Sequence, residues 1–168
     1  TWEAACASAN VALTAQKLVA SGERAAFALC RPPGHHAHAD LFGGYCFFNN
    51  AAITAQAFRD QGCERVAVLD VDFHHGNGTQ AIFYGRSDVL TISIHQDRNY
   101  PMDTGDFADR GKGDGVGYNL NIPLPPGVGH NGYLAAMDTL ALPAIRDFAP
   151  DVLIIACGFD AAANDPLG

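Results

Sequence analysis

The apolar residues of the chain fall into two kinds of block that alternate along the sequence. Short apolar runs predict buried strands, and longer Ala-rich stretches with apolar residues at helical spacing predict helices. Strand, helix, strand at this spacing indicates βαβ units, and therefore an α/β fold with a parallel sheet. The predicted strands are 25–30, 66–70, 89–94, 118–123 and 152–157, and the predicted helices are 2–21, 49–61, 78–85 and 131–148, with Pro143 as the weak point of the last helix.

Polar side chains stand at the ends of several predicted strands. Asp70, Asp72 and His74 end the run that begins at Val66, and Asp160 follows the last predicted strand. A strand alternates its faces, so Asp70, Asp72 and His74 are expected on one side. The carboxyl ends of parallel strands also share one edge, where sites form. Because an unpaired buried carboxylate is costly, we expect a metal, a cation or a wet site there. The alternative is a polar strand exit that carries a histidine by chance.

Two irregular stretches carry further polar and aromatic groups. Prolines precede His35 and His36 and predict a stiff loop that fixes both rings, although a histidine pair also occurs in loops that are merely polar. His38 is expected to be an exposed loop residue. Two glycines, the second of them Gly44, allow a tight turn that presents Tyr45 either as a pocket wall or as a core residue.

Composition and charge narrow the class of protein. The chain has 168 residues, which suits one domain, and its 48% hydrophobic content is that of a globular protein. Its formal net charge of −8 disfavours direct nucleic-acid binding. Neither a membrane span nor a signal pattern is visible. The five cysteines are scattered and odd in number, which favours reduced thiols and a cytoplasmic protein.

Three of the polar residues match the ligand number of a catalytic zinc site. Asp72, His74 and Asp160 supply two oxygens and one nitrogen, and such sites use three protein ligands and leave the fourth position for water or substrate. Zinc lowers the pKa of its water to near 7 and polarises a carbonyl, which permits hydrolysis without a covalent intermediate.

The histidine pair suits proton transfer beside such a metal. Histidine titrates near working pH, and one in this role needs a partner for its other ring nitrogen. Asp70 and Asn77 are available as partners. An Asp favours the charged imidazolium, whereas an Asn only orients the ring, so the Asp-paired histidine of His35 and His36 should be the more easily protonated.

Four motifs resemble a known family. They are Arg-Pro-Pro-Gly-His-His-Ala at 31–37, Gly-Gly-Tyr-Cys-Phe at 43–47, Asp-Val-Asp-Phe-His-His-Gly-Asn-Gly-Thr-Gln at 70–80, and Gly-Phe-Asp-Ala at 158–161 with Asp-Pro at 165–166. In kind and order they resemble the zinc-dependent histone deacetylase and acetylpolyamine amidohydrolase superfamily across essentially the whole chain. Asn77 and the Gly-Gly-Tyr-Cys segment look more like bacterial and class II members.

This resemblance implies an arginase-like, three-layer α/β fold around a mainly parallel sheet, with zinc on Asp72, His74 and Asp160. It implies that His36 is the general base and that His35, near Asp70, is its electrostatic partner. The residues implied to form the acyl-lysine tunnel are Gly44 and Tyr45 on one wall, Leu167 near the rim, and the 99–101 region of a long glycine-rich loop on the opposite wall.

The family also binds potassium, which the resemblance places at two positions. The first ion would take the Asp70 side chain and the backbone carbonyls of Asp72, His74, Ser93 and Ile94. The second would take carbonyls near Phe83, Arg86, Val89 and Tyr118.

The resemblance further implies that residues 1–168 are one deacetylase-like catalytic domain truncated at both ends. The family's Gly-Gly-Tyr segment, whose tyrosine donates to the oxyanion, is expected beyond residue 168. Losing one such donor costs ~100- to 1000-fold in rate, and missing sheet neighbours leave strand edges open. The sequence therefore predicts a poorly stable chain of weak or no activity.

Three functions stay open. The first is a zinc amidohydrolase acting on an acetylated lysine or polyamine. The second is a non-catalytic, metal-binding homologue or inactive fragment. The third is an arginase-type hydrolase with two manganese ions, to which Asp70 and His75 would have to contribute. The natural substrate and the oligomeric state are not determined by the sequence.

Overall fold

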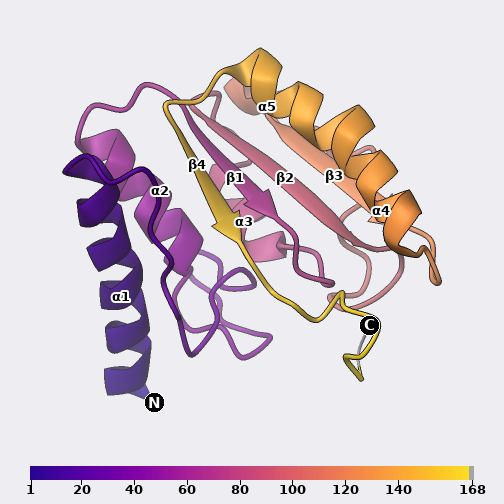
Figure 1. Cartoon of the computed structure of the whole chain (residues 1–168), viewed down its shortest axis with the longest axis horizontal. Coiled ribbons are helices and arrows are strands. Elements are labelled where there is room, and N and C mark those ends of the chain that lie inside the picture. The colour runs from indigo at the N-terminus through magenta and orange to yellow at the C-terminus, as the bar shows by residue number, and fades with distance from the viewer. Residues whose placement is uncertain (167–168) are drawn as a thin grey trace.

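A computed structural model describes residues 1–166, which form a central sheet with helices on both faces (Figure 1). The strands are β1 (Val66–Asp70), β2 (Val89–Gln96), β3 (Asn119–Leu124) and β4 (Val152–Ala156). Their spatial order is β3-β2-β1-β4, and all three pairings are parallel. The predicted α/β class with a parallel sheet is confirmed.

Alternate residues of β1 pack into two different cores, which explains the three layers. Val66 and Val68 face a cluster that includes Ala55 and Phe58, whereas Ala67 and Leu69 face a cluster on the opposite side of the sheet. The first layer contains α1 (Trp2–Ala20), α2 (Asn50–Asp60) and α3 (Asn77–Phe83). The other contains α4 (His130–Ala136) and α5 (Leu142–Phe148). Both faces of β1 are therefore apolar, as in other sheets covered on both sides.

The prediction of a strand at residues 25–30 is wrong. The segment belongs to no strand of the sheet, and the backbone hydrogen bond from Cys30 to the carbonyl of Ala28 is local. Its side chains are not core residues either, because Phe27 is 67% and Leu29 is 79% exposed. An apolar run becomes a strand only where a neighbouring edge satisfies its backbone groups, and among residues 1–166 no strand pairs with this one.

The predicted helix at 131–148 is interrupted rather than continuous. A π-helical turn, Met137–Ala141, separates α4 from α5. Pro143 lies in the first turn of α5, where its missing N–H leaves no interior hydrogen bond unmade. The wider turn just before Pro143 is the way the chain accommodates that proline.

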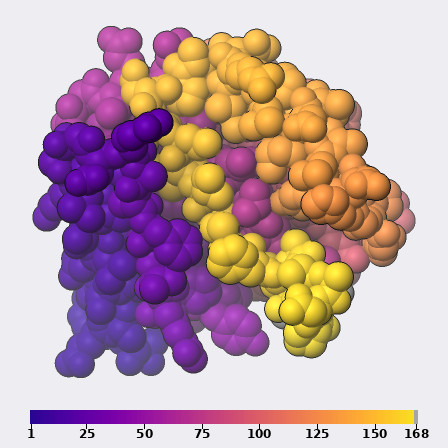
Figure 2. Space-filling view, viewed as in Figure 1, coloured from indigo at the N-terminus to yellow at the C-terminus, as the bar shows by residue number. Residues whose placement is uncertain are grey.

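Strand β4 lies at the edge of the sheet and is only partly covered. Figure 2 shows it open to view between the N-terminal segments and the α4–α5 layer. Leu153 and Ile155 of this strand are 40% and 51% exposed. The chain that follows β4 leads to Asp160, so this edge sits directly beside the candidate site. Within residues 1–166, no helix is both long and apolar enough to cross a membrane.

Candidate active site

Asp72, His74 and Asp160 converge at the carboxyl edge of the sheet. One ligand atom from each lies within 4.8 Å of the others. The Nδ1 atom of His74 lies 3.1 Å from Asp72 Oδ1 and 2.9 Å from Asp160 Oδ2. Ligand atoms ~2.0–2.2 Å from a tetrahedral zinc would be spaced by about 3.3–3.6 Å, close to these distances. The three side chains are 17–19% exposed, so the cluster is accessible. The donor set and spacing fit zinc.

Parallel pairing of β1 with β4 brings the distant third ligand into place. Asp70 at the end of β1 lies opposite Ala156 at the end of β4, so the chain leaving each strand enters the same space. The backbone N–H of Phe73 then donates to Asp160 Oδ1 at 3.0 Å. Gly158 permits this approach, because a Cβ there would lie 2.0 Å from Asp72 Oδ2. This need for glycine is a contribution that sequence reasoning missed.

The strand that carries the first ligands ends earlier than the alternation argument assumed. β1 stops at Asp70, and Asp72 and His74 lie in bends beyond it. Their orientation comes from local hydrogen bonds instead. Asp70 Oδ1 accepts from the Asp72 N–H, and Asp72 Oδ1 accepts from the His74 N–H. Asp70 itself is 2% exposed, and its Oδ2 lies 2.8 Å from His35 Nδ1.

His35 and His36 lie side by side next to the cluster, with their ring centroids 3.9 Å apart. His35 Nδ1 lies 2.8 Å from Asp70 Oδ2, and His36 Nδ1 lies 2.8 Å from Asn77 Oδ1. Both partners accept, so both Nδ1 atoms carry a proton. The Nε2 atom of His35 lies 3.8 Å from Asp72 Oδ1. The two histidines therefore have the Asp and Asn partners that the sequence offered.

The two histidines have opposite pKa shifts. Burial alone would lower the pKa of His35, but Asp70, with smaller contributions from Asp72 and Asp160, raises it to about 9. Burial lowers the pKa of His36 to about 4, and the charge of His35 adds to this effect. At neutral pH, His35 is charged and His36 is neutral with a free lone pair on Nε2. This difference is the one expected from their partners.

Asn77 joins His36 to a third histidine. The Nδ2 atom of Asn77 lies 3.1 Å from His38 Nε2, while its Oδ1 atom accepts from His36. His38 is partly buried, so its prediction as an exposed loop residue is wrong. The reason is that the loop folds back at this point, where His38 N–H donates to the carbonyl of Leu41.

Aromatic residues lie around the histidines at the mouth of the site. The ring of Tyr100 stands edge-on to His36 at 5.1 Å and to His74 at 6.1 Å between centroids. Gly44 packs so closely against His36 that a Cβ there would lie 2.2 Å from its ring. Tyr45 is 88% exposed at the surface beside this turn. Leu167, predicted near the rim, lies outside the described residues.

The residues expected at the two potassium positions come from neighbouring elements. Asp70 and Ser93 are register partners in β1 and β2, and Ile94 follows Ser93. For the second position, the carbonyls of Phe83 and Tyr118 already accept from the backbone N–H groups of Arg86 and Thr91. The other two residues of that set are Arg86 and Val89, the latter at the start of β2.

A cysteine nucleophile is disfavoured at this site. Cys46 is fully buried two residues from Gly44, and its thiol donates to the Gly44 carbonyl. Burial raises the pKa of Cys46 to about 11, which keeps it protonated. The chemistry therefore falls to the carboxylates and histidines.

The three-layer parallel sheet, with its ligand cluster at the carboxyl edge, places the chain in the arginase/deacetylase class of α/β folds. A crystal structure of an acetylpolyamine aminohydrolase from Burkholderia pseudomallei superposes with a TM-score of 0.97 at 51% identity, covering 100% of this chain and 49% of that one. Residues 1–168 match the histone deacetylase domain, and the chain belongs to that family.

Curated relatives agree with this assignment. Acetylpolyamine amidohydrolase 1 of Pseudomonas aeruginosa is 56% identical over 99% of this chain and 49% of its own length. Histone deacetylase 8 of Arabidopsis thaliana is 44% identical over 99% of this chain and 46% of its own length. The chain thus spans about half the length of the curated relatives it matches.

Proposed function

We propose that this chain carries the metal site and histidine pair of a zinc-dependent amidohydrolase that removes acetyl groups from N-acetylated amines. The observation that carries the proposal is the convergence of Asp72, His74 and Asp160 beside one charged and one neutral histidine. The family membership supports hydrolysis of an acetyl amide in particular.

Asp72, His74 and Asp160 would hold the zinc. When bound there, zinc would lower the pKa of a water molecule and polarise the carbonyl of the amide. The surrounding backbone prepares these ligands, since the N–H of Phe73 orients Asp160 and the N–H of His74 orients Asp72. Such oriented ligands need little rearrangement on metal binding.

His36 is suited to take the proton from the attacking water. Its Nδ1–H is held by Asn77, so its lone pair is on Nε2. Because its pKa is lowered, this nitrogen is free at neutral pH. His35 keeps its proton through Asp70 and places a fixed positive charge beside the site, where negative charge develops on the substrate oxygen.

An acetylated polyamine or an acetylated lysine is the proposed substrate. Relatives named as acetylpolyamine amidohydrolases and as histone deacetylases both match this chain well. Tyr100 and Tyr45 would contact the apolar part of either substrate. The chain's net charge of −8 suits a cationic substrate.

All five cysteines are free in the structure, which supports a cytoplasmic location.

Potassium is proposed at the two positions named from the family. Asp70 and Ser93 both line one small cavity beside the metal site, which supports the first position. The second, on carbonyls of Phe83, Arg86, Val89 and Tyr118, is supported by the nearness of the first three in sequence and by the pairing of Thr91 with Asn119, the residue after Tyr118. A cation at the first position would lie beside the Asp70 carboxylate and weaken its hold on the His35 proton.

Zinc binding tests the proposal directly. Asp160→Asn removes one charged ligand from the cluster, so zinc affinity should fall by more than the ~10- to 100-fold that loss of an outer-shell partner costs. Asp147→Asn is the matched control, because Asp147 is an exposed carboxylate on α5. Affinity is measured by competition with a chromogenic chelator, and metal content by elemental analysis.

One zinc per chain, lost in Asp160→Asn and kept in Asp147→Asn, is the expected result. Equal affinity in the two variants contradicts the ligand set, and two manganese ions per chain contradict the single-metal site. Deacetylation is assayed on acetyl-lysine peptide and acetylpolyamine side by side. Tight zinc binding without turnover of either substrate would identify a non-catalytic homologue or an inactive fragment.

A further inference from the structure

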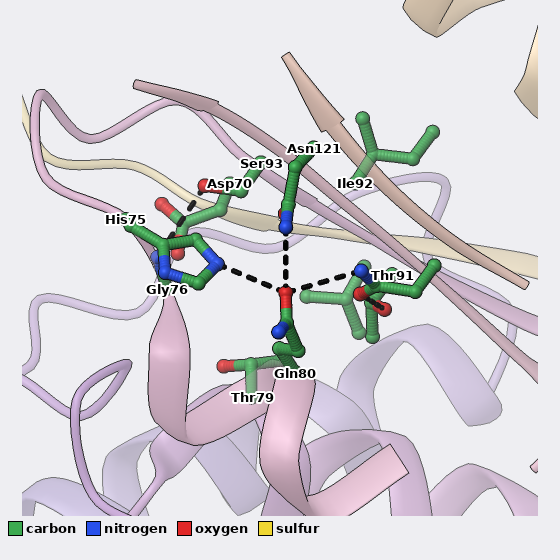
Figure 3. Close-up of a pocket in the computed structure, with 11 residues that line it drawn as sticks. Asp70, His75, Gly76, Thr79, Gln80, Thr91, Ile92, Ser93 and Asn121 are labelled. Carbon is green, nitrogen blue, oxygen red and sulfur yellow. Dashed lines mark hydrogen bonds between the residues drawn. The ribbon is translucent and has the colours of Figure 1, made fainter. Parts of the chain in front are cut away.

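A second polar cluster lies next to the metal site, between α3 and the sheet. Its centre is the side-chain oxygen of Gln80, which accepts three hydrogen bonds (Figure 3). The donors are His75 Nε2 at 3.0 Å, Asn119 Nδ2 at 3.0 Å and Asn121 Nδ2 at 2.8 Å. All three donor residues are buried, with 1–2% of their surface exposed. Buried donors of this kind are costly to leave unpaired, so Gln80 supplies an acceptor that they require.

The two asparagines determine which groups donate and which accept in this network. Asn119 also donates to the carbonyl of Asp109, and its Oδ1 accepts from Thr91. Asn121 also donates to the carbonyl of Asp106. Both amide nitrogens must therefore face Gln80, which requires that Gln80 present its oxygen to them.

This assignment also fixes the proton on His75. Since Gln80 presents an oxygen, the Nε2 atom of His75 carries the hydrogen and its Nδ1 atom accepts. The single hydroxyl proton of Thr104 can be donated either to that Nδ1, 2.9 Å away, or to the carbonyl of Pro101, 2.8 Å away, but not to both at once.

Apart from the bond between Asn119 and Thr91 of β2, the outer contacts of the cluster are made to one loop, residues 97–118 between β2 and β3. Asn119 and Asn121 bind the carbonyls of Asp109 and Asp106, and His75 binds Thr104. The ring of His95 lies 4.7 Å from that of His75 between centroids, and its Nε2 lies 3.1 Å from the Gly105 carbonyl oxygen of the same loop. A loop of this length pays a large ordering entropy unless it is anchored.

The anchored loop carries Tyr100, whose ring stands against His36 and His74. Three anchors, Thr104, Asp106 and Asp109, follow Tyr100 by 4–9 positions. The space enclosed by the cluster is about 10 Å³, near the minimum for one water molecule, so it has room for a water or a single ion but not for an organic ligand. The network is therefore built to hold structure.

We propose that Gln80 is a positioning residue of the active site: its side-chain oxygen holds His75, Asn119 and Asn121 in the arrangement that fixes the 97–118 loop and thereby places Tyr100 against the histidines. The catalytic consequence rests on the proposed function, whereas the anchoring of the loop does not.

Loop anchoring is tested by hydrogen exchange in the 168-residue chain without substrate. Gln80→Met keeps the length of the side chain but removes the acceptor, and Gln80→Glu keeps an acceptor. Gln56→Met is the matched control, since Gln56 is an exposed glutamine on α2. We expect exchange across residues 103–110 to accelerate by at least about 10-fold in Gln80→Met, because up to three buried hydrogen bonds of about 1 kcal/mol each are lost. Gln80→Glu and Gln56→Met should exchange like the parent chain.

Unchanged exchange in a folded Gln80→Met variant overturns the proposal, as does equal acceleration in Gln80→Glu. If Gln80→Met fails to fold, Thr104→Val decides, because Thr104 is exposed and its loss removes the contact between the loop and His75 together with one bond to Pro101 inside the loop. Faster exchange in 103–110 is then expected, and unchanged exchange overturns the anchoring.

The catalytic consequence of the proposal is tested by steady-state kinetics on protein that turns over substrate. In Gln80→Met, KM should rise about 10-fold with a smaller fall in kcat, and zinc affinity should stay at the parent value. If Tyr100 is displaced from the substrate, KM changes more than kcat. If the variant is only less stable, the amount of active protein falls while KM stays constant. An unchanged KM despite accelerated loop exchange overturns the positioning role. A protein that neither binds zinc nor turns over contradicts the proposed function but leaves the exchange result interpretable.

Discussion

At the scale of the single residue, the site depends on what stands behind each histidine ring. His35 and His36 are neighbours in sequence and nearly touch in space, but the ring of His35 is hydrogen-bonded to a carboxylate and that of His36 to an amide. The same burial that lowers the pKa of His36 is outweighed at His35 by Asp70. One proton is thus stored on His35, and one lone pair is kept available on His36.

Gly44 fixes the position of the His36 ring. A Cβ at Gly44 would lie 2.2 Å from His36 Cδ2, so Gly44→Ala should displace the ring and lower kcat at least about 10-fold, as 1 Å misplacements do. Gly113→Ala is the matched control, because Gly113 has φ +52° against +53° at Gly44 but no atom near its Cβ. Both variants carry the same backbone strain of about 1–2 kcal/mol. Equal activity in the two variants would show that contact with His36 is unimportant.

At the scale of the element, the start of α2 is tied to the histidine loop. Asn49 accepts from the Ala52 N–H and so caps the helix. Its amide also donates to the carbonyl of Ala37 and to the hydroxyl of Thr79 on α3. One buried side chain therefore joins a helix end, the loop after His36 and a second helix.

Two substitutions separate these roles of Asn49. Asn49→Asp keeps the oxygen that caps the helix but loses the amide that donates to Ala37 and Thr79. Asn49→Ala loses the capping oxygen as well as these two donated hydrogen bonds. A cap is worth about 1 kcal/mol, and an unpaired buried carbonyl costs about 1–3 kcal/mol. The free energy of unfolding in urea should fall in both variants, and further in Asn49→Ala. If Asn49→Asp is as stable as the parent, the bridge to Ala37 contributes nothing.

At the scale of the whole molecule, three buried histidines give the metal-free chain a pH optimum of stability. The pKa of His36 is lowered to about 4 and that of His75 to about 3. From pH 6.5 down to about 4, the unfolded chain binds protons at these positions that the folded chain does not, so stability falls on acidification. The pKa of His35 is raised to about 9, so its contribution is complete below pH 6.5 and is lost as pH rises through 9.

These shifts predict a maximum of stability near pH 6.5. Urea midpoints of chelator-treated protein, measured at intervals from pH 4.5 to 9.5, should decline on both sides of this value. Asp70→Asn removes the charge that raises the pKa of His35 and should flatten the alkaline decline. A midpoint that rises steadily across the whole range contradicts the assigned shifts.

The sequence by itself determined the elements and the chemistry. Uniform apolar runs specify strands covered on both faces, so β1 and β2 were predictable almost to the residue. Asn49 and Pro143 marked a helix start and a weak point because their effects are local. The residue types at the strand ends indicated a candidate metal site, and the partners Asp70 and Asn77 followed from residue chemistry.

Only the tertiary structure decided which of these groups meet. Residues 25–30 have a strand-like pattern but no paired neighbour among residues 1–166, and pairing is a non-local property. The pairing of Asp70 with Ala156 brings Asp160 to Asp72, and it depends on the order of strands in the sheet. The Gln80 network and the close approaches of Gly44 and Gly158 arise from contacts between separate elements. A residue pattern encodes local preference and chemical type, whereas distance between remote side chains is set by packing of the whole chain.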